Sequence, residues 1–249
     1  MKPIIIFKII IFSVLIHKAA SQNLIVEYEF KDYKIPIKAQ LITYESYSLY
    51  SVFYSLLTEQ TINEGNEFNS HTVEINPAKD LHFIKNFQKR DIKYKGGVFN
   101  KSFFVTDSLD TFHWKILQDT VSILGIKCQK AETSFRGRDY EAYFTTDIKV
   151  PDGPWKFNGL PGLILRIFSL DDTYSFEAKS IEVFEDTLDI EKFTKDYKGD
   201  LKDLKFTEFS ELSTQKLSDS YLKQKAELSQ DGVTFKTISL EVFFEYPED

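Results

Sequence analysis

The sequence predicts a mainly β protein of the α+β class, in which a curved antiparallel sheet or meander packs against one or two amphipathic helices near the carboxyl terminus. Two observations predict this. Residues 24–184 form a succession of short runs rich in Phe, Tyr, Ile and Val, separated by turn signals. From about residue 189 the pattern changes to charged residues with apolar positions every three or four, which favours helix. We therefore expect one β-rich domain over residues 22–249.

Residues 24–33 alternate apolar and charged side chains, as in a strand with one buried face. Residues 136–139 form a short polar loop in which Gly137 can take positive φ, so residues 127–135 and 140–148 should pair as a hairpin. Lys95-Gly96-Gly97 predicts another hairpin turn. The stretch from residue 163 is apolar on both faces and must be covered on both. The other expected strands are 41–57, 72–75, 91–94, 98–106, 163–170 and 174–184.

The helical segment is expected over about residues 189–230, where leucines and aromatic residues recur at helical spacing. Asp231-Gly232 would end it. A final strand over residues 233–246 would then close the domain.

Residues 1–21 are typical of a signal peptide, with a basic start, an apolar stretch interrupted by Lys8, and small residues before a cleavage point expected after Ser21. The alternative is an uncleaved membrane anchor, but the apolar run is shorter than the roughly 20 residues that span a bilayer. No later segment is long and apolar enough. We expect an exported product without a transmembrane segment in the mature chain.

The net charge is −7, and loss of the leader would remove Lys2, Lys8 and Lys18 but no acid. An acidic surface repels phosphate backbones, so we expect no nucleic-acid partner.

Cys128 is the only cysteine, so the chain gains no internal disulfide. Its surroundings alternate like a half-buried strand, which favours a small buried residue. An intermolecular disulfide or a reactive thiol are the alternatives.

The sequence holds no recognisable catalytic, metal or cofactor motif. His71, His82 and His113 lie in separate stretches without metal-ligand spacing, and no G-x-S-x-G element occurs. We assign no catalytic residue, no metal and no cofactor, and lean against an enzyme. A secreted hydrolase remains the alternative from another class. It would need His113 or His82 to converge with a carboxylate such as Asp110 or Asp147.

Two short elements could contact a partner. Arg136 and Arg138 flank the glycine of a hairpin tip and could present forked donors to a carboxylate or phosphate; the alternative is a solvated turn or an intramolecular ion pair. In the turn at residues 151–154, Asp152 can accept backbone N–H bonds. The adjacent Trp155 is either a packing anchor or an exposed recognition aromatic.

Residues 150–165 hold the most distinctive stretch, in which the turn signals Asn158-Gly159 and Pro161-Gly162 stand within five residues. The hexapeptide at its centre is Gly159, Leu160, Pro161, Gly162, Leu163 and Ile164. Such a loop is stiff and shaped, and it feeds a buried strand.

The motifs from Trp114 onward resemble the GLPGLI family, a set of exported proteins of Gram-negative envelopes. The matching elements, in order, are Trp114, Cys128-Gln129-Lys130-Ala131, Gly137-Arg138, Ala142-Tyr143-Phe144-Thr145, Gly153-Pro154-Trp155 and the hexapeptide. Tyr143 stands where the family usually has tryptophan, and Lys149 where a proline often precedes the turn.

The resemblance implies a bacterial source, a periplasmic, envelope-associated or secreted location, and no established activity. It marks as family-defining Arg138, Ala142, Gly153, Pro154, Trp155, Gly159, Leu160, Pro161, Gly162, Leu163 and Ile164. A motif dominated by Gly, Pro and Leu constrains backbone shape. We therefore expect a non-enzymatic binding or scaffolding protein, whose curved sheet offers a groove to an envelope or outer-membrane protein or to an apolar ligand. By analogy, such a sheet is similar to those of envelope carriers of lipoproteins. A structural subunit of an outer-membrane assembly is a further alternative.

Overall fold

A computed structural model describes residues 23–56, 80–109, 112–184 and 188–216 of the chain. The expected signal peptide, the strand at 72–75, the helical residues after 216 and the final strand at 233–246 lie outside the described residues.

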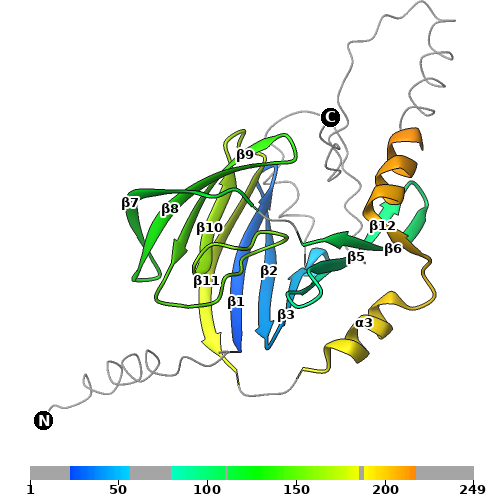
Figure 1. Ribbon diagram of the computed structural model, residues 1–249, viewed down its shortest axis with the longest axis horizontal. Helices are drawn as coiled ribbons and strands as arrows, with labels where there is room; N and C mark the ends of the chain where they lie inside the picture. The colour runs from blue at the N-terminus through cyan, green and yellow to red at the C-terminus, as the bar shows by residue number, and fades with distance from the viewer. Residues whose placement is uncertain (1–22, 57–79, 110–111, 185–187, 217–249) are drawn as a thin grey trace, which may run out of the picture.

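Twelve strands form one sheet, and every pairing is antiparallel except the parallel pair of β12 with β6 (Figure 1). From one edge to the other the order is β12, β6, β5, β4, β3, β2, β1, β11, β10, β9, β8, β7. The mainly β class is thereby confirmed. The strands are β1 (Leu24–Asp32), β2 (Ile35–Tyr44), β3 (Tyr47–Val52), β4 (Leu81–Asn86), β5 (Asp91–Val98), β6 (Lys101–Ser108), β7 (Lys115–Ile123), β8 (Ile126–Phe135), β9 (Arg138–Thr145), β10 (Leu163–Ser169), β11 (Tyr174–Val183) and β12 (Asp203–Lys205).

The centre of the sheet joins the first strand to a late one. β1 pairs on one side with β2, its neighbour in sequence, and on the other with β11, so that Leu24 lies opposite Val183. Strands β1 to β6 therefore extend the sheet in one direction, and β11 back to β7 extend it in the other.

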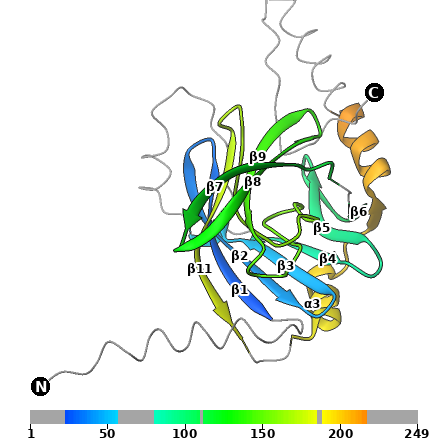
Figure 2. The ribbon, with the colours of Figure 1, turned by 60° about the vertical axis from the view of Figure 1, so that its left-hand side comes forward.

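The sheet is strongly curved, and Figure 2 shows the strands wrapped around the segment that links β9 to β10. The register places on one face Tyr28 of β1, Tyr50 of β3 and Phe83 of β4. Their rings pack together, and each is less than one tenth exposed. This inner face carries the main hydrophobic core of the domain.

The outer face is largely charged. Cross-strand ion pairs join Glu27 to Lys38 at 2.8 Å and Lys130 to Glu141 at 2.5 Å. Part of this face, Leu49 and Ile84, is covered by Ile190 of helix α3 (Ile190–Lys198). Helix α3 therefore covers the outer face at β3 and β4, and not at β10, the strand that the sequence predicts to be covered on both faces.

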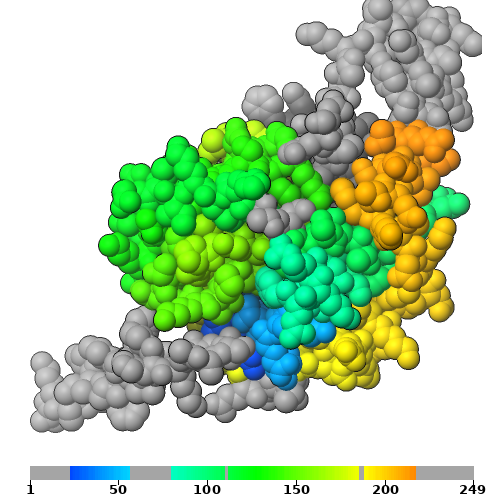
Figure 3. Space-filling model, in the orientation of Figure 1, coloured from blue at the N-terminus to red at the C-terminus, as the bar shows by residue number. Residues whose placement is uncertain are grey.

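Two helices follow the strands within the described residues, as expected. Asp189 caps α3 by accepting the backbone N–H of Lys192 at 2.9 Å. Residues 206–216 form the second helix, whose Phe209 is buried against Phe103 of β6. The short strand β12 between the helices was not predicted, because three residues without a buried side chain carry no clear pattern. Figure 3 shows both helices, in yellow and orange, on the side of the molecule where β4–β6 lie.

The turn predicted at Lys95-Gly96-Gly97 is wrong. Strand β5 runs through these residues, and the hairpin turns after Val98, which lies opposite Lys101. A Cβ atom on Gly96 would lie 2.6 Å from Cζ of Phe209. The glycine is needed for close approach of the second helix, not for a turn.

The expected strand at 41–57 is wrong, because the chain turns after Tyr44 and β2 pairs with β3 as a hairpin. Two other hairpins match the sequence expectations. Arg136 and Gly137 both take positive φ, 47° and 77°, in the two-residue turn between β8 and β9. Strands β10 and β11 pair around residues 170–173.

Candidate functional site

The segment between β9 and β10, residues 146–162, carries most of the motif and is called here the motif segment. Its backbone is closely bonded to itself and to β10. The N–H of Gly159 donates to the carbonyl of Pro151 at 3.0 Å, and that of Ile164 donates to the carbonyl of Asp152 at 3.0 Å. Asp152 and Asn158 also form an antiparallel bridge. The segment is a shaped loop, and Gly159 takes positive φ, as Asn158-Gly159 predicts. Pro-Gly favours a type II turn with positive φ at the glycine, but Gly162 does not take positive φ, so that turn is not formed.

A buried ion pair holds the motif segment on the inner face. Lys85 of β4 donates from Nζ to Asp152, to the Gly153 carbonyl at 2.8 Å and to the Phe157 carbonyl at 3.4 Å. The side chains of Lys85 and Asp152 are 0% and 1% exposed. Burial lowers the pKa of Lys85, and the Asp152 carboxylate opposes that shift.

Sequence reasoning missed Lys85. The signal was the alternation in Leu-His-Phe-Ile-Lys-Asn, which places Lys85 on the same face as the buried Phe83.

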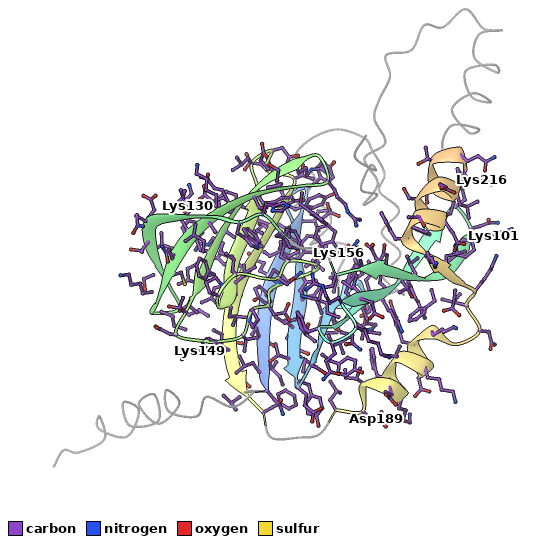
Figure 4. The ribbon with its side chains drawn as sticks, viewed as in Figure 1. Lys101, Lys130, Lys149, Lys156, Asp189 and Lys216 are labelled. Atoms are coloured by element: carbon purple, nitrogen blue, oxygen red, sulfur yellow. The ribbon has the colours of Figure 1, made fainter. Side chains whose placement is uncertain are left out.

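A second ionic group lies where the motif segment meets β6. Oδ2 of Asp107 accepts from Nζ of Lys156 at 2.9 Å and from Nη2 of Arg136 at 3.1 Å. The Arg136 guanidinium also lies 4.2 Å from the ring centroid of Phe206. Figure 4 shows Lys156 in the interior, whereas Lys130 and Lys216 lie at the periphery. Of the two alternatives for Arg136, the structure shows an intramolecular ion pair.

The aromatic residues of the motif segment are packing anchors. Trp155 is 9% exposed, and its ring meets those of Phe135 and Phe157 edge to face. Trp114, which lies just before β7, donates from Nε1 to the carbonyl of Asn158 at 2.9 Å. The curved sheet was expected to offer a groove to an apolar ligand. Near the motif, its inner face is instead filled by the side chains of Trp155, Phe157 and Leu160.

The hexapeptide makes close backbone contacts. A Cβ atom on Gly162 would lie 1.9 Å from the carbonyl oxygen of Thr145, and Gly159 takes a φ of 88°. Gly153 faces Ile164, whose Cβ would lie 2.8 Å from an added Cβ. Leu160, Leu163 and Ile164 are buried, whereas Pro161 is exposed. Close packing therefore accounts for most of the motif.

The remaining predicted residues also have structural neighbours. Arg138 donates from Nε to Asp171 at 2.8 Å, so it too lies in an intramolecular ion pair. Ala142 is fully buried on β9, and Pro154 is buried in the motif segment.

Cys128 is fully buried, and burial raises the pKa of its thiol to about 11. A protonated buried thiol fits the buried-strand interpretation and not a reactive thiol.

Within the described residues, His82 and His113 lie in different surroundings and are not joined to Asp147. His82 lies beneath α3, with Nδ1 at 2.8 Å from Oγ of Ser51 and its ring against Phe193 and Tyr197. No hydrogen bond or ion pair joins His82 or His113 to Asp147 among the described residues, and Asp110 and His71 lie outside them. No group of metal-ligating side chains occurs in the described part of the chain.

Within the described ranges, no helix has the length and apolar character needed to cross a membrane.

Comparison with known proteins relates this fold to one class of domain. The family model described as N-glycanase peptide, N-terminal domain, matches residues 99–208, less than half of the chain. The match includes the motif segment, β9 and β10, but not β4 with Lys85. No curated protein matches the sequence.

Among solved structures, the chain is similar to PNGF-II in two crystal forms, each with a TM-score of 0.51 and with 18% and 17% sequence identity. These matches cover 78% of this chain and 33% and 34% of PNGF-II. An uncharacterized conserved protein from Thermus thermophilus matches with a TM-score of 0.43 and 9% identity, over 80% of this chain and 99% of that one. The likeness to PNGF-II shows a shared fold, and this chain spans about a third of the length of PNGF-II.

Proposed function

We propose that this chain is an exported, non-enzymatic binding or scaffolding domain of the bacterial cell envelope and a member of the GLPGLI family. One observation carries the proposal. The polar side chains of the motif segment are engaged inside the protein: Asp152 with Lys85, and Lys156 with Asp107. A motif used in this way sets the shape of a surface.

The comparisons support a role in glycan handling. The matching model is named for the N-terminal domain of an N-glycanase, and the structural match spans only about a third of PNGF-II. We propose that the present chain binds a glycan or a glycan-bearing partner and acts beside that partner. Since the motif segment occupies much of the inner face, the partner or ligand would bind at the turns and edges of the sheet.

Export and partner binding can be tested together in a Gram-negative host. We expect the full chain to appear in the periplasmic fraction without residues 1–21, and a chain starting at residue 22 to remain in the cytoplasm. A photo-crosslinking residue at Tyr33 should capture one dominant envelope protein in intact cells, identified by mass spectrometry. The same residue at Lys130, on the charged outer face, is the matched control. A full-length chain retained uncleaved in the cytoplasm would refute export, and equal diffuse crosslinking from both positions would refute a specific partner.

A further inference from the structure

Three turns lie side by side at one end of the sheet. They join β1 to β2, β8 to β9, and β10 to β11, and the strand order brings them together (Figures 1 and 2). The N–H of Tyr33 in the first turn donates to the carbonyl of Thr173 in the third at 3.0 Å. Arg138 after the second turn pairs with Asp171 in the third. The turns therefore form one continuous surface.

Aromatic rings and carboxylates converge on this surface. The Tyr33 ring meets the buried ring of Tyr174 edge to face at 6.4 Å and is itself 50% exposed. The Asp171 side chain is 46% exposed. Asp32 lies opposite Tyr174 in the β1–β11 pairing, on the inner face. We call Asp32, Tyr33, Arg138, Asp171 and Tyr174 the turn cluster.

Asp32 of the turn cluster is partly buried and lies near Arg138. Its Oδ1 atom is buried without a hydrogen-bond partner. Burial raises the pKa of this carboxyl to about 6, although Arg138 opposes the shift. A buried acceptor without a donor destabilises the folded state, so it needs an explanation. A ligand hydroxyl would supply the donor.

The backbone beside Asp32 is strained. Tyr33 and Lys34 take φ values of 45° and 76°, in a two-residue turn that glycine or asparagine would occupy at lower cost. The strain holds the exposed Tyr33 ring above Tyr174.

The chemistry of the turn cluster selects a neutral polar ligand. An anion would meet Asp171 and Asp32, and the Arg138 guanidinium is already paired with Asp171. A cation would compete with that guanidinium, which lies 5.1 Å from the Tyr174 ring centroid. A sugar, in contrast, can stack its ring on an exposed aromatic side chain and donate its hydroxyl groups to carboxylate oxygens.

We propose that the turn cluster binds a neutral carbohydrate, with Tyr33 against the face of a sugar ring and Asp32 and Asp171 accepting hydrogen bonds from its hydroxyl groups. This site rests on the proposed role in glycan handling and gives that role a place and a ligand class.

The test uses the purified full chain with the neutral N-glycan core pentasaccharide and its chitobiose disaccharide as probes. We expect calorimetry to show binding, and amide shifts in ¹⁵N spectra to cluster at residues 32–34, 138 and 171–174. Tyr33→Ala and Asp32→Asn should each weaken binding at least tenfold. Phe99→Ala is the matched control for the first variant, because Phe99 is 65% exposed with a φ of 54° in another hairpin turn. Asp119→Asn, on exposed β7, is the control for the second.

Three results would overturn the inference: no binding of either probe at millimolar concentration, shifts elsewhere on the protein, or equal affinity in the Tyr33→Ala and Phe99→Ala variants. The wild-type spectra give an answer even where a variant fails to fold. Capture of an envelope partner in cells without glycan binding in vitro would refute this site and leave the binding or scaffolding function standing. Retention in the cytoplasm would refute export and leave the carbohydrate measurement valid.

Discussion

Lys85 and Asp152 form a fully buried ion pair that links strand β4 to the motif segment, and the two residues are 67 positions apart in the sequence. Loss of one partner leaves the other charge buried and unpaired, which costs about 3–5 kcal/mol. The pair is therefore a strong constraint on where the motif segment lies.

We expect Asp152→Ala to lower the free energy of unfolding by about 3–5 kcal/mol, because Lys85 would keep its charge in an apolar site. The double variant Lys85→Met with Asp152→Leu should lose much less. Urea unfolding measures both. The control is Glu141→Gln on the outer face, whose pair with Lys130 is partly exposed and contributes about 1 kcal/mol or less. The single variants Lys85→Met and Asp152→Leu complete the comparison, and a loss in the double variant equal to the sum of their two losses would contradict the coupling.

Gly162→Ala should destabilise the protein by more than about 3 kcal/mol or prevent folding, because the added Cβ would lie 1.9 Å from a backbone carbonyl oxygen. Gly97→Ala is the matched control, since its added Cβ would meet its nearest atom at 3.9 Å. Thermal unfolding followed by circular dichroism compares the two. Similar midpoints would show that the hexapeptide backbone can shift.

Asp32 gives stability a distinctive pH dependence. Its carboxyl has a pKa of about 6 in the folded protein against an ordinary value of 3.8, because burial outweighs the nearby Arg138. The folded state therefore binds the proton more tightly than the unfolded state, and the stability that this proton gives is lost as pH rises from about 4 through 6. The expected loss is on the order of 2 kcal/mol.

Asp32→Asn removes this titration, and the variant keeps the same Arg138, Tyr54 and Tyr174 around residue 32. We expect it to match the wild type near pH 4 and to exceed it near pH 7.5 in urea unfolding. Asp119→Asn should show no such crossover. A constant difference between wild type and Asp32→Asn at all pH values would exclude a raised pKa.

The Cys128 thiol should be inert in the folded protein, because it is fully buried and its pKa is raised to about 11. A disulfide reagent at pH 8 should label it only in denaturant, at least a hundredfold faster than in buffer. Rapid labelling of native protein would restore the reactive-thiol interpretation.

Local patterns in the sequence predict much of this fold. Alternation marks β1, and the glycine at residue 137 marks the β8–β9 turn, since both depend on near neighbours. Gly96 was misread because the residue that requires a glycine there, Phe209, lies more than a hundred positions away in the sequence. The ring of Phe209 packs so closely on Gly96 that a Cβ atom would not fit. Lys85 and Asp107 were missed because a charged residue in a strand is usually exposed, and only the folded chain brings their partners to them. Trp155 and Arg136 were left with two interpretations each, and the packed inner face selects between them.

The pairing of β1 with β11 also governs when the domain can form. Strand β1 gains its second neighbour only when β11, from residue 174 onward, has been made, and four further strands, β10 to β7, lie beyond that neighbour. Contacts so distant in sequence slow folding, because the chain loses the entropy of closing a long loop before the stabilising contacts form. Synthesis of the first half of the chain alone cannot bury the inner face. The strands β1 to β6 can pair in the order of their synthesis, whereas the second edge of β1 stays without its partner until β11 has been made.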